Sequence, residues 1–354
     1  MKKILIYYKS LNRLGGIERV ISNWANELAT DYKITILTKD SVEIKLYFND
    51  KITIKTLSVM REDSKNNSLI NIIKSRHALK KFLKHNDFDF IYTATIIETF
   101  EIYLTSKKYL KRVIASEHGS FFAYNKCYIM LRKLIYPHIY KVICPNKMDT
   151  EIYKQLNFNV TYIPHLITFS PISKIEKKEK IILNVGRLTN DKQQLLLLKM
   201  WNDLNLKNNL NDWKLYIIGS GELKSEIEDY VRIHKLENTV SIIEATKNIK
   251  DYYLKASIFA FSSKMEGFGM VLIEAMAYGN CCISFDCPSS PKDIIKNNYN
   301  GFLIPCFNES EYEKKLLSLI KNDQLRNRLN ENALNSMNKW DNGKIKRQMR
   351  DIFN

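Results

Sequence analysis

Short apolar runs alternate along the whole chain with longer stretches that place apolar residues at helical spacing. Runs of about four to eight residues rich in Ile, Val, Leu and aromatic residues predict strands, and the longer periodic stretches predict helices. Strands that alternate with crossover-length helices indicate parallel sheets covered by helices on both faces. The alternation runs through the chain twice, which predicts two doubly wound α/β domains.

The predicted elements divide into two sets. In the first half, strands are expected at 4–8, 34–38, 52–57, 90–93, 113–116 and 142–144, and helices at 17–29, 69–83, 99–108 and 148–156. In the second half, strands are expected at 181–185, 215–218, 240–243, 258–261, 282–285 and 301–303, and helices at 195–208, 223–233, 249–254, 271–277, 291–296 and 309–320. The polar, linker-like segment 169–180 lies between the sets, so we place the domain boundary after residue 168.

The composition is that of a globular protein. Apolar residues make up 45% of the 354 residues and charged residues 26%, and no window of 18 residues is apolar and uncharged, which argues against a disordered or membrane-spanning chain. The short N-terminal apolar run is interrupted by Lys9 and has no small-residue cleavage site, so a buried strand is expected there rather than a signal peptide. Six cysteines without CxxC spacing predict neither a zinc site nor disulfides, and the expected compartment is the cytoplasm.

The positive charge is concentrated in the first half. The formal net charge is +17, and residues 1–170 hold 27 Lys and Arg against 15 Asp and Glu. This excess favours anionic partners, whether phosphate-bearing ligands, acidic lipid or nucleic acid. Basic residues accompany helical apolar spacing over 69–85, and they mix with aromatic residues over 103–141. These segments fit an interfacial surface for anionic lipid or, as the alternative, sheet-covering helices with a solvated basic face.

Glycines follow a predicted strand in both domains. Gly15 and Gly16 lie where a loop becomes a helix, and glycine lets backbone amides approach an anion at a helix N-terminus. A tight loop without chemical importance is the alternative. Gly219 begins a Gly-Ser-Gly-Glu turn after another strand. That turn lacks the third glycine of a dinucleotide fingerprint and no acid follows a strand about 20 residues on, which argues against NAD.

Two cations follow the first strand of the second domain. Arg187 and Lys192 lie just beyond 181–185, at the carboxyl end of a buried strand, where open α/β sheets bind ligands. A guanidinium and an ammonium there are suited to a diphosphate, because charge-assisted hydrogen bonds contribute about 1.5 to 3 kcal/mol each. An ordinary pair of solvated loop cations is the alternative.

Two carboxylates lie within an apolar, glycine-punctuated stretch, Glu-Gly-Phe-Gly-Met-Val-Leu-Ile-Glu at 266–274. Glu266 precedes the expected helix start near Gly269, and Glu274 lies about one turn inside the helix. Amides at a helix N-terminus suit phosphate, and a carboxylate accepts two hydrogen bonds from a vicinal diol, as in a sugar or ribose. The alternative is that Glu274 only complements the helix dipole and Glu266 is solvated.

Together these motifs resemble the retaining glycosyltransferases of family four, which have the GT-B fold. The resemblance spans about residues 4 to 305, and the motifs occur in the order that the family shows. It rests on Glu266 to Glu274, on Gly186, Arg187 and Lys192, on the turn at Gly219, on Asn-Gly-Phe-Leu at 300–303 and on Gly-Gly-Ile-Glu at 15–18.

The resemblance implies an architecture. It implies two Rossmann-like domains that face each other across a cleft: an acceptor-binding domain at 1–168 and a nucleotide-sugar-binding domain at 169–335. It also implies that the C-terminal segment 336–354 forms a helix that returns to the first domain.

The resemblance also implies residue roles. Glu274 would bind the nucleotide ribose and Glu266 the donor sugar hydroxyls, while Arg187 and Lys192 would hold the diphosphate. His118 matches the active-site histidine of the family, and Gly15 and Gly16 would form the loop beneath the diphosphate. The base would be recognised by backbone around Glu244 to Thr246, near the turn at Gly219. The amides that would contact sugar and phosphate are those of Gly267, Phe268, Gly269, Met270 and Val271.

Two positions depart from the family pattern. The usual glycine after the diphosphate lysine is Gln193, and the usual asparagine of the interdomain Ile-Pro-Asn pattern is His165. Neither change touches the proposed diphosphate cations or the paired glutamates.

The implied reaction is a front-face transfer with retention that needs no metal, because the two cations and the helix amides stabilise the leaving phosphate. An Asp-x-Asp triplet, the metal signature of the other glycosyltransferase fold, occurs at 87–89. It precedes the strand at 90–93, where a polar turn is expected, so we assign it no metal.

The sequence therefore predicts a glycosyltransferase that moves a hexose or N-acetylhexosamine from a nucleotide sugar, UDP favoured over GDP, to a saccharide acceptor. An undecaprenyl-linked acceptor and the anionic cytoplasmic face of the inner membrane are the expected setting, and nucleic acid is not an expected partner. The alternatives are a nucleotide-sugar epimerase or phosphorylase on the same scaffold, and a non-catalytic protein that binds an anionic glycan.

Overall fold

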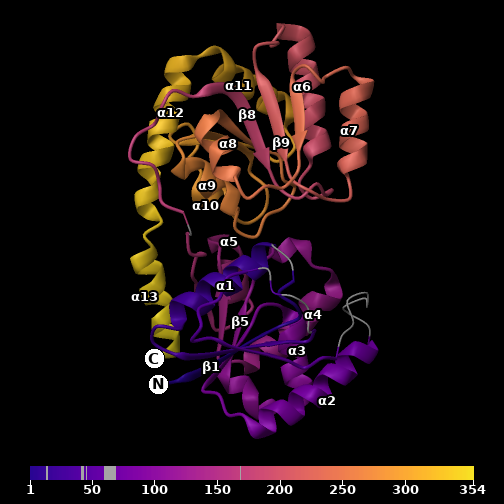
Figure 1. The fold of residues 1–354 in the computed structure, drawn as a ribbon, viewed down its shortest axis with the longest axis vertical. Coiled ribbons are helices and arrows are strands. Elements are labelled where there is room, and N and C mark those ends of the chain that lie inside the picture. Colours follow the sequence, from indigo (N-terminus) through magenta and orange to yellow (C-terminus); the bar gives the residue numbers. More distant parts are fainter. Residues whose placement is uncertain (13–14, 41–43, 45, 60–68, 168) are drawn as a thin grey trace. The chain divides into compact units, whose positions relative to one another are not determined.

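The chain forms two compact units, seen in a computed structural model that describes residues 1–12, 15–40, 44, 46–59, 69–167 and 169–354, without the side chains of 69–71 (Figure 1). The first unit comprises Met1–Thr168 together with Asn342–Asn354, and the second comprises Phe169–Asp341. Each unit has its own parallel sheet, as the alternation of apolar runs and helical stretches predicts.

The first unit has a seven-stranded sheet in the order β3-β2-β1-β4-β5-β6-β7, and the order reverses direction between β1 and β4. All neighbouring strands are parallel. The strands are β1 (Lys3–Tyr8), β2 (Lys33–Thr38), β3 (Thr53–Thr56), β4 (Phe90–Thr93), β5 (Val113–Ser116), β6 (Lys141–Cys144) and β7 (Val160–Tyr162).

Helices cover both faces of this sheet because successive side chains of a strand point to opposite faces. In β1, Ile4 and Ile6 belong to one core cluster, which also holds residues of α1 (Gly16–Leu28) and α13 (Asn342–Phe353). Leu5 and Tyr7 belong to the other cluster. That cluster includes residues of α2 (Leu69–His85), α3 (Ile96–Thr105), η1 (Lys107–Arg112), α4 (Lys126–Ile135), η3 (Tyr136–His138) and α5 (Lys147–Gln155).

The second unit has a six-stranded parallel sheet in the order β10-β9-β8-β11-β12-β13, and its order reverses between β8 and β11. The strands are β8 (Glu179–Val185), β9 (Lys214–Ile218), β10 (Val240–Ile243), β11 (Ala256–Phe261), β12 (Cys281–Phe285) and β13 (Gly301–Ile304). The helices are α6 (Gln194–Asn208), α7 (Lys224–Ile233), α8 (Ile249–Lys255), α9 (Met270–Ala277), α10 (Pro291–Ile294), α11 (Glu309–Lys321) and α12 (Asp323–Asn335).

The C-terminal segment joins the first unit later than the predicted position 336. Residues 336–341 belong to the second unit, because the short helix η4 (Ser336–Lys339) and Trp340 pack there. The Trp340 ring lies edge-on to Phe268 at 5.5 Å, and Asn300 donates a hydrogen bond of 3.0 Å to the Ser336 hydroxyl. From Asn342 onward, α13 packs on the first unit through Phe353, whose ring contacts Phe90.

Glycines permit a close approach of the loops that follow β8 and β9. The Leu188 N–H donates to the Ser220 carbonyl at 3.1 Å. A Cβ atom on Gly219 would lie 1.8 Å from the Gly186 carbonyl oxygen, and one on Gly221 would lie 2.2 Å from that of Leu188. The Gly-Ser-Gly turn is therefore required for packing beside the first loop, whatever it binds.

We expect Gly219→Ala to lower the free energy of unfolding by about 2 to 3 kcal/mol, because the added methyl group must push two backbone segments apart. Urea unfolding measures this change. Gly16→Ala is the matched control: no atom lies within 4 Å of its Cβ position, so its stability should be unchanged or slightly raised. Equal losses in both variants would contradict the packing role.

Candidate functional site

The loops that follow β8 and β11 lie side by side in the second unit. The two strands are hydrogen-bonded neighbours, so their carboxyl ends meet at one edge of the sheet. The Lys264 N–H donates to the Asp191 carbonyl at 2.8 Å, and the Ser262 hydroxyl donates to the Lys192 carbonyl at 2.8 Å. This edge is the point at which the strand order reverses, where open α/β sheets bind ligands.

An ion pair joins these two loops. The Lys192 ammonium lies 2.6 Å from Glu266 Oε2, and the two side chains are 16% and 18% exposed. Burial alone would lower the pKa of Lys192, but the charge and hydrogen bond of Glu266 raise it overall. The Lys192 ammonium is therefore charged at neutral pH, and both side chains remain partly accessible. The structure brings together two residues that the sequence analysis assigned to different parts of one ligand.

Arg187 lies on the same loop as Lys192, and its side chain is exposed. Among the residues that the structure describes, no ion pair of its guanidinium is found. The positive charge of Arg187 partly opposes the rise in the pKa of Lys192. Two cations therefore occupy one short loop, and the second, Lys192, pairs with Glu266 at 2.6 Å and with Asp191 of its own loop at 3.7 Å.

The N-terminus of α9 lies directly after Glu266. Gly269 caps the helix with φ +77°, a left-handed conformation that favours glycine, and Met270 is the first helical residue. Phe268 is buried and contacts Trp340, so its side chain belongs to the core and only its backbone is suited to a ligand. Gly267 is buried and Val271 is half-buried.

Glu274 is held by a tyrosine that the sequence analysis did not single out. The Tyr253 hydroxyl, from α8, donates to Glu274 Oε2 at 3.0 Å. Tyr253 is fully buried, and its ring stacks on Tyr278 at 5.6 Å. This hydrogen bond to one carboxylate oxygen orients the Glu274 side chain. Tyr253 is the buried residue of α8, so the sequence pattern indicates core packing and gives no sign of its contact with Glu274.

The loops after β9 and β10 are joined beside the first pair. The Ser220 hydroxyl donates to Glu244 Oε2 at 2.6 Å, and the Lys224 ammonium pairs with the same carboxylate. The Lys224 hydrogen bond, with that of Ser220, lowers the pKa of Glu244, which is exposed. Thr246 accepts a hydrogen bond of 3.1 Å from the Asn248 N–H just before α8.

In the first unit, Gly15 caps α1 in an extended conformation. The Tyr8 hydroxyl donates to Glu18 Oε1 at 3.1 Å, and a Cβ on Gly15 would lie 2.4 Å from Glu18 Oε2. Gly15 thus leaves room for the buried Glu18 carboxylate, while Gly16 is exposed. Residues 13 and 14 of this loop lie outside the described residues.

His118 follows β5 and carries two buried ring nitrogens that have no hydrogen-bond partner among the described residues. Its ring stacks on His165 with centroids 5.3 Å apart. Burial lowers the pKa of His118 to about 4, although the charge of Glu117 opposes the shift. The imidazole is therefore neutral at pH 7, with one donor and one acceptor nitrogen.

The two departures from the family pattern have structural counterparts. Gln193 adopts φ 56° and ψ 37°, the left-handed conformation in which glycine is favoured, and its side chain donates to the Asn190 carbonyl at 2.6 Å. The other departure, His165, is 6% exposed and forms the histidine stack. Both positions retain an ordered local structure without the usual residue.

The Asp-x-Asp triplet has structural partners. Arg112 donates to Asp87 Oδ1 at 2.8 Å, and the Lys3 N–H donates to Asp89 Oδ2 at 2.7 Å. Within the described part of the chain, no group of three or more His, Cys, Asp or Glu residues could hold a metal ion. Metal independence remains a prediction. None of the described helices is long and apolar enough to span a bilayer.

Known protein families match the chain over nearly its whole length. The model of Glycosyltransferase Family 4 matches residues 14–169, and that of Glycosyl transferases group 1 matches residues 167–336. The chain belongs to the group 1 glycosyltransferases of the GT-B fold. Among solved structures, this glycosyltransferase resembles a mutant of S. aureus TarM in complex with fondaparinux, alpha-GlcNAc-glycerol and UDP, with a TM-score of 0.80, 17% identity and full coverage of both chains.

Two curated bacterial relatives are similar to this glycosyltransferase. One is the Campylobacter jejuni "GalNAc-alpha-(1->4)-GalNAc-alpha-(1->3)-diNAcBac-PP-undecaprenol alpha-1,4-N-acetyl-D-galactosaminyltransferase", 28% identical over 94% of this chain and 93% of that protein. The other is the Erwinia amylovora "Amylovoran biosynthesis glycosyltransferase AmsD", 26% identical over 100% of both.

The depressed pKa of His118 predicts a pH dependence of stability. The unfolded chain takes up a proton at this residue near pH 6.5, but the folded chain does so only near pH 4, so its contribution to stability is lost as the pH falls through this window. Between pH 7 and pH 5 the loss is about 2 kcal/mol. From pH 7 to pH 5, the free energy of unfolding of the wild type should therefore fall by about 2 kcal/mol more than that of His118→Asn. Urea unfolding of both proteins at the two pH values measures this difference. An identical pH dependence in both proteins would contradict the buried neutral imidazole.

Proposed function

We propose that this glycosyltransferase moves a hexose or N-acetylhexosamine from a nucleotide diphosphate sugar, UDP favoured, to a lipid-linked saccharide acceptor with retention, in cell-surface polysaccharide or glycan biosynthesis. The names of the two bacterial relatives refer to an undecaprenol-linked acceptor and to amylovoran biosynthesis. The S. aureus structure contains UDP. The observation that carries the proposal is the ion pair of Lys192 with Glu266 at the carboxyl ends of β8 and β11, with Glu274 on the helix that follows Glu266.

In this proposal the second unit binds the donor. Arg187, Lys192 and the amides at the start of α9 neutralise the diphosphate, as cations and a helix N-terminus do for phosphate groups. Glu274, oriented by Tyr253, accepts hydrogen bonds from the ribose hydroxyls, and Glu266 accepts them from the sugar. The loops that hold Gly219, Glu244 and Thr246 lie beside these groups and are assigned to the base.

The first unit is assigned to the acceptor and to the transfer. The neutral His118 imidazole offers a buried donor and a buried acceptor to hydroxyl groups, and the loop with Gly15 and Gly16 offers backbone amides to the diphosphate. The acceptor oxygen bonds to the anomeric carbon while the bond from that carbon to the phosphate oxygen breaks. The proton of the acceptor hydroxyl passes to the leaving phosphate, and the cations stabilise its growing charge without a metal.

The α4 outer face, defined here as Lys126, Met130, Lys133 and Leu134, is proposed to contact anionic lipid. These residues are spaced along one side of the helix, and Met130 and Leu134 are 69% and 50% exposed. Phe122, just before the helix, is 50% exposed. Apolar side chains flanked by lysines fit the boundary of an anionic bilayer. Over 72–85, the part of α2 whose side chains the structure describes, Ile73 is the one large exposed hydrophobic, so α4 fits this role better.

We expect Glu274→Ala to reduce kcat/KM for the donor about 30-fold or more, because hydrogen bonds to a charged group contribute about 2 kcal/mol. The measurement is transfer from a panel of nucleotide sugars, with the melting temperature as a check on folding. Glu331→Ala, an exposed glutamate of α12, is the matched control and should keep wild-type activity. Retained activity in Glu274→Ala would refute the donor site.

A labelled nucleotide sugar without acceptor distinguishes the alternatives. An epimerase turns it over, whereas the proposed transferase shows only slow hydrolysis. Phosphate-dependent release of a sugar phosphate would instead indicate a phosphorylase. A non-catalytic glycan-binding protein would show no turnover with any acceptor.

We expect the chain to sediment with vesicles that contain anionic phospholipid and not with phosphatidylcholine alone. Reversing the charge of Lys126 and Lys133 to Glu should weaken this binding at least about 30-fold, since each cation near the surface contributes about 1 kcal/mol. The same change at Lys80 and Lys81 of α2 is the matched control. If the α2 variant alone loses binding, the assignment to α4 is wrong.

A further inference from the structure

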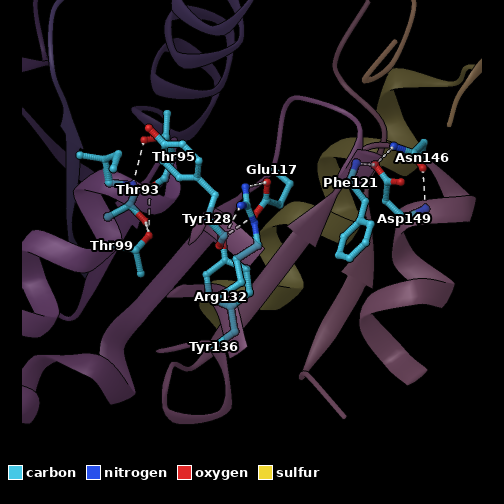
Figure 2. Close-up of polar contacts among 11 residues, drawn as sticks. Thr93, Thr95, Thr99, Glu117, Phe121, Tyr128, Arg132, Tyr136, Asn146 and Asp149 are labelled. Carbon is cyan, nitrogen blue, oxygen red and sulfur yellow. Dashed lines mark hydrogen bonds and ion pairs between the residues drawn. The ribbon is translucent and has the colours of Figure 1, made fainter. Parts of the chain in front are cut away.

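The loop that carries His118 is fixed by a buried ion pair next to it. Arg132, from α4, donates from Nε to Glu117 Oε1 at 2.7 Å and from Nη2 to Oε2 at 2.8 Å (Figure 2). The side chains of Arg132 and Glu117 are 1% and 2% exposed. This two-point contact fixes both the position and the plane of the carboxylate of the residue directly before His118.

Further contacts complete the arrangement around Glu117. The Tyr136 hydroxyl donates to Glu117 Oε1, and the Tyr124 ring lies over the guanidinium with its centroid 3.8 Å from Arg132 Cζ. A Cβ on Gly119 would lie 2.9 Å from the Tyr124 hydroxyl, so the chain directly after His118 passes close to the same tyrosine. Both sides of His118 are therefore shaped by groups that contact Arg132.

The far end of the loop is held separately. The Phe121 N–H donates to Asp149 Oδ2 at 3.1 Å, and Asn146 Nδ2 donates to the same oxygen at 2.9 Å (Figure 2). These groups come from the N-terminal region of α5, after β6. The segment 117–121 is thus held at both ends. Only the contact with Arg132 involves a charged residue directly next to the histidine, which is Glu117.

Stability alone is a weak reason for this ion pair. Burying two charges costs several kcal/mol, and well-packed apolar residues of similar volume often give equal or greater stability. Burial alone would raise the pKa of Glu117, but the charge and hydrogen bonds of Arg132 lower it overall, so the carboxylate stays ionised. An ionised carboxylate is thus kept beside a neutral imidazole.

We propose that Arg132 is a positioning residue for the transfer reaction: through Glu117 it fixes the backbone and ring of His118, and it balances the carboxylate charge that would otherwise favour a protonated imidazole. The proposal rests on the proposed function of His118. Arg132 acts on the His118 loop through Glu117, with Tyr124 as a second contact, and is not itself assigned to substrate.

The groups that set the protonation of His118 are few in the described part of the chain. Glu117 acts on it from the same loop, and His165, from the segment after β7, stacks against its ring. Arg132 acts from α4 through the Glu117 carboxylate. Removing Arg132 therefore leaves the Glu117 charge uncompensated, which raises the pKa of His118 above its value of about 4.

The test compares Arg132→Met, Arg132→Lys and a control, Lys39→Met. Lys39 is also a buried cation of the first unit, 2.8 Å from Glu101 and 3.5 Å from Glu98, and its side-chain contacts within the described residues are with these glutamates and Tyr7 rather than with the His118 loop. Its removal should cost comparable stability for the same physical reason. The readouts are the titration of isotope-labelled His118 by NMR, assigned with His118→Asn, and kcat and KM for the donor.

In Arg132→Met, we expect His118 to titrate at a higher pH than in the wild type. We also expect kcat to fall about tenfold while the donor KM changes less than about twofold, because the orientation of His118 rather than donor binding is lost. Arg132→Lys keeps the positive charge but loses the two-point guanidinium contact, so its His118 titration and its kcat should lie between those of Arg132→Met and the wild type. Lys39→Met should lose stability but keep the wild-type titration of His118.

A wild-type His118 titration and kcat in Arg132→Met would show that the pair is merely structural. If Arg132→Met does not fold, wild-type values in Arg132→Lys would overturn the proposal in the same way. A wild type without transferase activity, with His118 still shifted in the Arg132 variants, would refute the proposed function and leave the positioning of His118 intact.

Discussion

The reversal of strand order between β8 and β11 is the constraint on which the candidate site depends. It makes two strands from distant parts of the sequence hydrogen-bonded neighbours, so the loops at their carboxyl ends must lie side by side. Those loops carry Lys192 and Glu266, which are 74 residues apart in sequence and 2.6 Å apart in space. Hydrogen bonds between backbone and side chains hold the loops together, so the ion pair is placed by the sheet itself.

The residues around this edge show how the fold accommodates charge. Polar groups that are half-buried here are each oriented by a specific partner, such as Tyr253 for Glu274. Glycine occurs where a side chain would collide with the neighbouring loop, as at Gly219. The first unit uses the same principle at His118, where a buried arginine and carboxylate hold the adjacent backbone. In both units rigid elements fix the loops that carry the candidate functional residues.

The sequence predicted the strands well because the alternating side chains of buried strands, such as Ile4 to Tyr8 in β1, leave a strong apolar pattern. It missed β7, whose residues are only half-buried, α4, whose outer face mixes Met130 and Leu134 with lysines, and α12. It placed Glu266, Glu274 and His118 on the correct loops and helix. It could not predict the contacts of Lys192 with Glu266 or of Arg132 with Glu117, because side-chain pairing between loops depends on tertiary packing. The left-handed backbone at Gln193 likewise left no sequence signal apart from the departure from glycine.

A crystal structure of the chain with UDP bound tests the central claim most directly. The account predicts that the diphosphate lies at the carboxyl ends of β8 and β11, within about 3.2 Å of the Lys192 ammonium, with the ribose hydroxyls on Glu274. UDP bound away from this edge, or a bound nucleotide that contacts neither Lys192 nor Glu274, would contradict it.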